Sequence, residues 1–190
     1  AAVSYPPNGL HTLIIGESGV GKSLLAEEMW RYAAETGAFG NSSKEPPFVL
    51  FSCADYAENP QLLLSQLFGH AKGSFSGATE NKAGMVEKAE GGVLFLDEIH
   101  RLASTGQELL FTLLDKNKYR RLGETVERKS HVMIIGATTE RPSEVLLNTF
   151  MRRIPVVIQM PNLAERPPNE RLELVRHFLK LEANRLGIPI

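Results

Sequence analysis

Eight residues near the start of the chain constrain its fold more than any others. Residues 16–23 have the sequence Gly-Glu-Ser-Gly-Val-Gly-Lys-Ser: a glycine, four further residues, and then Gly-Lys-Ser. They lie between a short β-branched apolar run, residues 12–15, and a stretch with apolar residues at helical spacing, residues 23–36. A glycine-rich turn between a buried strand and a helix is the context of a P-loop, so we expect a phosphate site on an α/β fold. The alternative, an accidental match, is expected in roughly one chain in a hundred of this length, and less often in this context.

The rest of the chain alternates between apolar strands and amphipathic helices. This alternation predicts a parallel sheet covered by helices on both faces. We expect a hairpin over residues 119–129, and a mobile loop over residues 70–84, which contain three glycines and few apolar residues. The expected strands are residues 48–52, 93–96, 132–135 and 156–158, and the expected helices are residues 61–68, 85–89, 109–114 and 169–186, with Gly187 as the stop of the last one.

The composition is that of one ordinary soluble domain. Of 190 residues, 43% are apolar and 23% charged, and a net charge of −1 gives no positive field that would draw the chain onto nucleic acid or an anionic membrane. No apolar run approaches the roughly 20 residues that span a bilayer, and no leader opens the chain, so we expect no membrane contact. The single cysteine, Cys53, fits a reducing cytosol and a small buried residue, and the five scattered histidines argue against a zinc site. The chain begins without Met, as expected of an excised piece.

The P-loop pattern assigns chemical roles to its residues. The glycines let successive backbone N–H groups point at phosphate oxygens, and the following helix offers its positive end. Lys22 is expected to reach the outer phosphates of ATP, and Ser23 to bind Mg²⁺. The residues expected to bind the nucleotide are Gly16, Glu17, Ser18, Gly19, Val20, Gly21, Lys22, Ser23 and Leu24.

Two adjacent carboxylates end the most apolar strand, at the edge where open α/β sheets bind ligands. Asp97 is expected to hold Mg²⁺ through water. Glu98 would orient and polarise the attacking water, a role that hydrolysis requires and simple phosphate binding does not. An acidic pair that merely ends a strand is the alternative, and a complete P-loop earlier in the chain argues against it.

Two further pairs have two interpretations each. Thr138 and Thr139 follow an expected strand, where they either contact the γ-phosphate through a hydroxyl or simply cap the strand end. Arg152 and Arg153 are either a solvated surface or an arginine finger that enters a neighbouring subunit's site. Such a finger is worth about 10³ to 10⁵ in rate where it has been measured.

One segment narrows the choice of protein family: residues 69–78, Gly-His-Ala-Lys-Gly-Ser-Phe-Ser-Gly-Ala. They resemble the loop of the bacterial enhancer-binding activators of sigma-54 RNA polymerase, whose motif is Gly-Ala-Phe-Thr-Gly-Ala. The likeness extends over about residues 10–166. The other segments that resemble this family are residues 16–22, 53–54, 67–70, 91–99, 119–123 and 135–138.

The resemblance implies an AAA+ ATPase, a three-layer P-loop NTPase fold that assembles as a homo-oligomeric ring hexamer with ATP and Mg²⁺ between subunits, in the bacterial cytoplasm. Its partners would be the sigma-54 factor and RNA polymerase, with DNA bound by a domain outside this chain. The residues that would touch the sigma factor are Gly73, Ser74, Phe75, Ser76, Gly77 and Ala78. A phenylalanine between flexible glycines, with little nearby to bury it, is expected as an exposed apolar tip, although a lone phenylalanine is more often core.

Three polar positions depart from the family pattern. Ser76 keeps the hydroxyl of the family's threonine without its methyl group, and Ser52 and Thr139 stand where the family usually has asparagine. Both substitutes can form hydrogen bonds with a shorter reach. We therefore expect the contacts that couple Glu98 to the loop of residues 70–84 to differ from those of the family.

The arginines depart too, because Leu147 occupies the first of two family arginine positions and Arg153 the second, which leaves Arg152 as a stand-in. With Tyr5-Pro6-Pro7-Asn8-Gly9 and residues 147–153, these changes resemble the levanase-operon regulator branch. That branch carries sugar-phosphotransferase regulatory domains elsewhere in its chain.

The sequence therefore predicts an ATPase core over residues 1–166 and the first helix of a small, truncated lid over residues 167–190. ATP hydrolysis by this core would remodel sigma-54 RNA polymerase and open promoters. Two alternatives are a small-molecule P-loop kinase, for which no acceptor pocket is apparent, and a non-hydrolytic nucleotide-binding scaffold.

Overall fold

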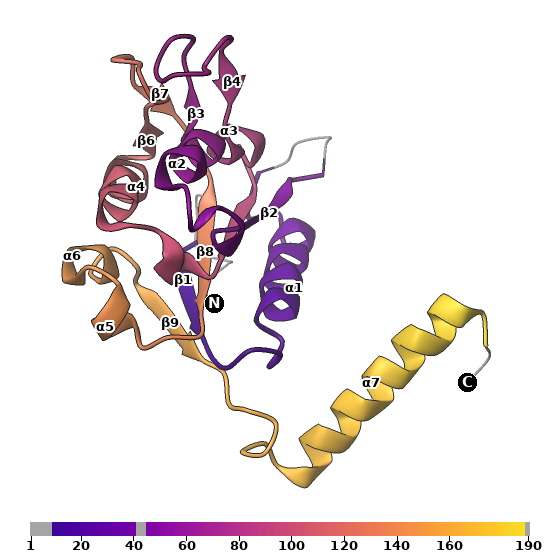
Figure 1. The fold of residues 1–190 in the computed structure, drawn as a ribbon. Coiled ribbons are helices and arrows are strands. Elements are labelled where there is room, and N and C mark those ends of the chain that lie inside the picture. Colours follow the sequence, from indigo (N-terminus) through magenta and orange to yellow (C-terminus); the bar gives the residue numbers. More distant parts are fainter. Residues whose placement is uncertain (1–8, 41–44, 189–190) are drawn as a thin grey trace.

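The centre of the molecule is a five-stranded parallel sheet with the strand order β2-β5-β8-β1-β9 (Figure 1). The computed structural model describes residues 9–40 and 45–188. The predicted α/β fold is confirmed. The five strands are β1 (Thr12–Ile15), β2 (Phe48–Ser52), β5 (Val93–Asp97), β8 (Met133–Thr138) and β9 (Val156–Gln159).

Side chains along each central strand alternate between two buried clusters, one on each face of the sheet. Leu13 of β1 belongs to one cluster and Ile14 to the other, as the two-residue period of a strand requires. The same alternation divides Leu94 from Phe95 in β5. Both faces of the sheet are therefore apolar, which is why its strands have nearly continuous hydrophobic sequences.

Helices cover both faces, as predicted. On one face, α1 (Lys22–Glu35) buries Ala26 and Ala33 against the sheet. The opposite face is covered by α2 (Pro60–Phe68), α3 (Met85–Lys88), α4 (Ser104–Lys116) and α6 (Asn148–Met151). Each of these helices contributes buried residues to the cluster that contains Leu13 and Leu94. The sequence did not predict α6, α5 (Pro142–Val145), or the 3₁₀ helices Ala54–Tyr56 and Ile99–Arg101.

Strand β8 continues three residues beyond its predicted end at Ile135. Gly136 does not interrupt it, because the space above this glycine is filled by a neighbour: a Cβ there would lie 3.0 Å from Ile99 Cδ1. The strand therefore runs to Thr138 and delivers its polar end to the same sheet edge as Asp97.

Two small antiparallel pairs lie outside the main sheet. The expected hairpin is present as β6 (Lys118–Tyr119) and β7 (Arg128–Lys129). We expected a mobile loop over residues 70–84, but its base is regular, because β3 (Gly69–His70) pairs there with β4 (Lys82–Ala83). Two-residue strands are too short to show an alternating pattern in sequence.

The last helix, α7 (Pro168–Leu186), ends at Gly187 in the left-handed conformation, as predicted. It extends away from the sheet (Figure 1). Its apolar side, including Leu172, Val175 and Leu179, is at least half exposed, so the expected amphipathic helix is present but that side is not buried. None of the helices in the described ranges combines the length and apolar character that crossing a membrane requires.

Cys53 follows β2 and is fully buried. Burial raises the pKa of its thiol to about 12, with a further contribution from the carboxylates of Asp97, Glu98 and Asp55. A thiol held in this state is a poor nucleophile, which agrees with the structural role expected from the sequence.

Candidate functional site: a P-loop, an acidic strand end and a paired loop

The P-loop begins where β1 ends, between the ends of two neighbouring strands. The Gly16 N–H donates to the Thr138 carbonyl at 3.2 Å, and the Met160 N–H donates to the Ile15 carbonyl at 2.7 Å. A Cβ on Gly16 would lie 2.9 Å from Val20 Cγ2, so this position has no room for a side chain. Gly19 and Gly21 have φ of 80° and 99°, which glycine adopts without strain. The glycines of the motif therefore form the compact turn that precedes α1.

Lys22, the first residue of α1, turns back over this loop. Its ammonium donates to the Gly16 carbonyl at 2.8 Å and to the Glu17 carbonyl at 2.9 Å, and the side chain is buried. An ammonium group can make three hydrogen bonds, and two are used on the loop's own backbone. The charge is thus held within the turn that is expected to surround the phosphates. Ser23 is exposed beside it.

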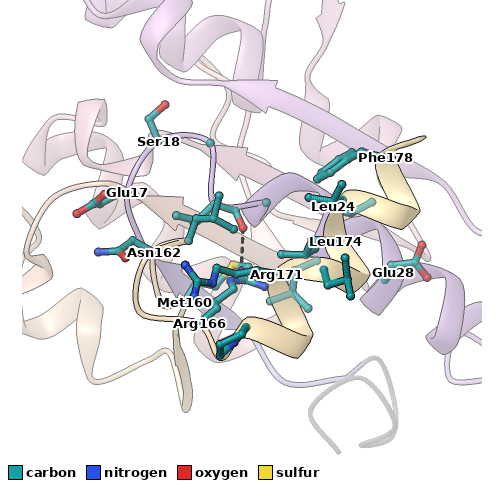
Figure 2. Close-up of a pocket in the computed structure, with 18 residues that line it drawn as sticks. Glu17, Ser18, Leu24, Glu28, Met160, Asn162, Arg166, Arg171, Leu174 and Phe178 are labelled. Carbon is teal, nitrogen blue, oxygen red and sulfur yellow. Dashed lines mark hydrogen bonds between the residues drawn. The ribbon is translucent and has the colours of Figure 1, made fainter. Parts of the chain in front are cut away.

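A cavity of about 890 Å³ opens between the P-loop, α1 and α7 (Figure 2). Six of the nine residues expected to bind the nucleotide line it, and Gly16, Lys22 and Ser23 do not. Apolar residues of α1 and α7 form much of the wall, and Arg166 closes one side by donating from Nη2 to the Val20 carbonyl at 3.1 Å. The lining residues outside the motif include Leu25, Met160, Leu163, Leu174 and Phe178.

Asp97 and Glu98 lie at the carboxyl end of β5. The Glu98 N–H donates to Asp97 Oδ1 at 3.0 Å, and Glu98 itself has a left-handed backbone with φ of 49° and ψ of 47°. A non-glycine residue in this region is uncommon and is found often at functional sites. The turn begins the 3₁₀ helix Ile99–Arg101 and fixes the direction of the Glu98 side chain.

Thr139 and His100 both approach the same oxygen of Glu98. Thr139 Oγ1 donates to Glu98 Oε2 at 3.2 Å, and His100 Nε2 lies 3.4 Å from that oxygen. Thr138, at the end of β8, contacts the other ring nitrogen of His100. Thr139 therefore lies at the expected sheet edge, but its contact with Glu98 was not predicted from the sequence. Ser52 bonds elsewhere: its hydroxyl donates to Asp55 Oδ1 at 2.9 Å.

The loop that carries Gly73, Ser74, Phe75, Ser76, Gly77 and Ala78 is folded back on itself. The Gly73 N–H donates to the Ala78 carbonyl at 2.8 Å, and the Ala78 N–H donates to the Phe75 carbonyl at 3.0 Å. The expectation that Phe75 forms an exposed tip is wrong, because its ring is partly buried and meets the His70 ring edge-on, with centroids 5.0 Å apart. His70 is held in turn by a 2.7 Å hydrogen bond between Ser65 Oγ and its Nδ1.

The base of this loop is attached to the β6–β7 hairpin. The Ala71 N–H donates to the Leu122 carbonyl at 2.9 Å, and the Leu122 N–H donates to the Gly69 carbonyl at 3.0 Å. Glu87 of α3 anchors the hairpin: Glu87 Oε2 accepts hydrogen bonds from Arg121 Nη2 at 2.7 Å and from the Tyr119 hydroxyl at 3.1 Å. The hydrogen bond from Arg121 holds the pKa of Glu87 below its usual value, whereas burial and the Glu87 carboxylate raise the pKa of Tyr119 to about 12.

Comparison with known proteins decides the family. Residues 2–159 match the family described as the Sigma-54 interaction domain. The chain belongs to the sigma-54 interaction domain family. Among curated proteins, this domain is 55% identical over 187 residues to the transcriptional regulatory protein LevR of Bacillus subtilis and 50% identical to the transcriptional regulatory protein DagR of Salmonella typhimurium. Each alignment covers 98% of this chain but 20% of the relative, so the chain spans about a fifth of their length.

Solved structures agree with this assignment. NtrX from Brucella abortus in complex with ATP superimposes with a TM-score of 0.75 at 28% identity, over 98% of this chain and 39% of NtrX. The complex of NtrX with ADP gives a TM-score of 0.74, over 95% of this chain and 38% of NtrX.

The two candidate arginines of this sigma-54 interaction domain differ in their surroundings. Arg153 donates from Nε to Asp115 Oδ2 at 2.7 Å, and its guanidinium lies 4.2 Å from the centre of the Phe111 ring. The side chain of Arg152 is exposed. Within the described ranges, neither arginine is hydrogen-bonded to the P-loop or to Glu98.

Sequence reasoning missed two residues at this site, Arg166 and His100. Arg166 lies in a proline-rich connection without periodicity, so nothing in its neighbourhood indicated a contact with a loop 146 residues earlier. His100 follows Glu98 by two residues, and this proximity was the available signal. The levanase-branch segment at Tyr5 to Asn8 lies outside the described residues.

Proposed function

We propose that this chain is an ATPase domain that uses hydrolysis to remodel sigma-54 RNA polymerase and open promoters. Membership of the sigma-54 interaction domain family supports the role in transcription activation. The ATP and ADP complexes of NtrX support the choice of nucleotide. The observation that carries hydrolysis is the arrangement of Glu98, a carboxylate oriented by Thr139 at the same sheet edge from which the P-loop starts.

In this proposal each polar group at the edge has a distinct task. Lys22 stabilises the charge on the outer phosphates, and Thr139 senses the γ-phosphate. Glu98 orients the water that attacks the γ-phosphorus and accepts its proton, so that a new P–O bond forms as the bond to the β-phosphate breaks. Either arginine of the pair Arg152 and Arg153 would stabilise this charge in a neighbouring subunit.

Ser23 and Asp97 would hold Mg²⁺. Their hydroxyl and carboxylate oxygens suit this hard cation, which commonly takes one or two protein ligands together with phosphate oxygens and water. Asp97 has acceptor capacity beyond its single bond to the Glu98 N–H. Among the described residues, no group of three or more His, Cys, Asp or Glu side chains could hold a metal ion alone, which agrees with a cation carried by the nucleotide. Bound there, Mg²⁺ would neutralise developing phosphate charge.

The loop of residues 73–78 would contact the sigma factor. Its backbone forms a closed turn on the β3–β4 pair, and Phe75 rests on His70. A partly exposed aromatic ring on a short turn can leave this contact and enter an apolar site on a partner. ATP and ADP must favour different loop positions with different affinities for this coupling to occur.

The wider organisation follows the same proposal. Residues 1–166 form the ATPase core, and residues 167–190 begin a lid whose first helix lines the nucleotide cavity. The complete protein would assemble as a bacterial cytoplasmic hexamer. Other parts of it would bind DNA and respond to the sugar phosphotransferase system.

Phosphate release from ATP tests the enzymatic part. Glu98→Gln keeps the size of the side chain but removes the proton acceptor, so we expect ATP binding within about twofold and turnover at least about 100-fold lower. Glu108→Gln, an exposed carboxylate on α4, is the matched control and should keep wild-type turnover. Equal turnover in Glu98→Gln and wild type would remove Glu98 from this role. Transfer of phosphate to a small molecule would indicate the kinase, and a wild type that binds ATP without turnover would indicate the scaffold.

Binding to a sigma-54 fragment tests the loop. Phe75→Ala removes the aromatic ring, and we expect sigma-54 affinity to fall at least about tenfold while ATP turnover stays within about twofold. Tyr32→Ala, which removes a half-exposed ring on α1, should leave both properties unchanged. Loss of both properties in a folded Phe75→Ala protein would show that Phe75 is structural.

A further inference from the structure

The backbone at Glu98 places a histidine beside the carboxylate. Because Glu98 is left-handed and begins a 3₁₀ helix, the chain turns back within two residues and the His100 ring lies alongside Glu98. The side chain of His100 is 7% exposed, and its Nε2 lies 3.4 Å from Glu98 Oε2. The other ring nitrogen, Nδ1, lies 3.0 Å from Thr138 Oγ1.

Hydrogen-bond chemistry assigns the ring protons. An ionised carboxylate only accepts hydrogen bonds, so a favourable contact with Glu98 requires a proton on His100 Nε2. Thr138 Oγ1 accepts from the Glu140 N–H at 3.1 Å. Its own proton has two acceptors within reach, the Glu140 carbonyl at 3.5 Å and His100 Nδ1 at 3.0 Å, and the shorter distance favours His100. Every polar group in the series from Glu140 through Thr138 and His100 to Glu98 then has a partner if His100 Nε2 carries a proton and His100 Nδ1 accepts one hydrogen bond.

The strand that could have supplied a partner for Glu98 does not do so. Ser52 ends β2 opposite Asp97, in register with it, and gives its hydroxyl to Asp55 instead. Both contacts to Glu98 Oε2 come from other segments: Thr139 after β8, and His100 in the 3₁₀ helix. Thr139 Oγ1 donates to this oxygen and His100 Nε2 lies 3.4 Å from it, so two segments of different origin contact one carboxylate oxygen.

We propose that His100 is a positioning residue, which together with Thr139 holds the Glu98 carboxylate in the orientation that activates water. This inference rests on the proposed ATPase function. His100 touches neither the phosphates nor the water in this scheme and acts through Glu98 alone. Its link to Thr138 connects the orientation of Glu98 to the end of β8, next to Thr139.

Three substitutions separate positioning from packing. In His100→Gln the side-chain amide can take the place of Nε2–H and reach Glu98, whereas in His100→Asn it can take the place only of Nδ1 and reach Thr138. We expect kcat to fall at least about tenfold in His100→Ala and His100→Asn and to stay within about threefold in His100→Gln, with KM for ATP unchanged in all three. His131→Gln is the matched control. This exposed histidine also lies beside a glutamate, Glu90, but not beside Glu98, so the variant should keep wild-type kcat.

A measurement of the ring nitrogens makes the inference independent of turnover. Nitrogen-15 NMR at pH 8 should show a proton on His100 Nε2, and the signal should shift in Glu98→Gln. An Nε2 without a proton, or equal kcat in folded His100→Asn and His100→Gln, would overturn the positioning role. A wild type without turnover would refute the ATPase proposal, and the NMR result would still decide the contact between His100 and Glu98.

Discussion

His11, immediately before β1, is held neutral chiefly by its burial. The Ile134 N–H donates to His11 Nδ1 at 3.1 Å, so this nitrogen must be free of a proton. Burial lowers the pKa of His11 from its ordinary value of 6.5 to about 4, although a bond to the Leu114 backbone opposes the shift. The residue lies at the amino end of the sheet, opposite the P-loop edge, so its effect is on stability.

The direction of the pH effect follows from that lowered pKa. Between pH 6.5 and about 4 the unfolded chain binds a proton at His11 that the folded chain excludes, so the free energy of unfolding decreases as the pH falls through this range. The full loss is about 3 kcal/mol and is absent above the ordinary pKa. Urea unfolding at several pH values measures it.

A paired control isolates His11. In His11→Asn the amide oxygen can still accept from Ile134 but does not titrate, so the decrease between pH 6.5 and 4.5 should be much smaller. His177→Asn, on exposed α7, should keep the wild-type slope. Because the lowered pKa values of Glu87 and Glu124 act below 4.5, a His11→Asn protein with the full wild-type slope would show that the decrease has another origin.

At the scale of elements, the loop of residues 69–83 and the β6–β7 hairpin behave as one unit. Backbone bonds between residues 69–71 and Leu122 join their bases. Their tips meet at Gly123, which has φ of 77° and where a Cβ would lie 2.5 Å from Ser74 Cβ. A movement of the hairpin must therefore move the segment that carries Phe75.

Gly123→Ala tests this junction. The added methyl group cannot fit against Ser74, so we expect a loss of about 1–3 kcal/mol in stability and weaker sigma-54 binding, with ATP affinity unchanged. Gly91→Ala is the matched control, since Gly91 also has positive φ, 73°, but open space around it. Equal sigma-54 binding in the two variants would show that the junction does not position the loop.

Local sequence patterns predicted the helices and strands, but they did not predict contacts between residues far apart in the sequence. The P-loop turn and β5 were predictable because their residues are consecutive and their neighbours follow from periodicity. The bond from Thr139 to Glu98 joins residues 41 apart, and periodicity carries no information on such a pair. Phe75 was predicted to be exposed because nothing in the loop could bury it, yet its partner His70 lies five residues earlier on β3. For α7, the pattern gave the helix but not what covers its apolar side.

At the scale of the whole molecule, we propose that an arginine from a second copy of the chain completes the site. Arg153 is fixed within its own subunit by Asp115, by the Thr149 carbonyl at 2.6 Å, and by the Phe111 ring. Arg152, one residue earlier, is exposed and is the better candidate to reach a neighbouring subunit. Substitution of Arg153 should then chiefly lower stability, and substitution of Arg152 should chiefly lower turnover.

Mixing two inactive variants separates these roles. Arg152→Ala keeps Glu98 but offers no finger, so it should lose about 10³-fold or more in turnover. Glu98→Gln keeps Arg152 but cannot activate water, so it should lose at least about 100-fold. In a mixed assembly some interfaces combine an intact Glu98 with an intact Arg152, and phosphate release should recover to a substantial fraction of wild type and rise with protein concentration. Arg141→Ala, another exposed arginine, should need no complementation. If the mixture stays as inactive as its components at concentrations where it assembles, Arg152 does not act across the interface.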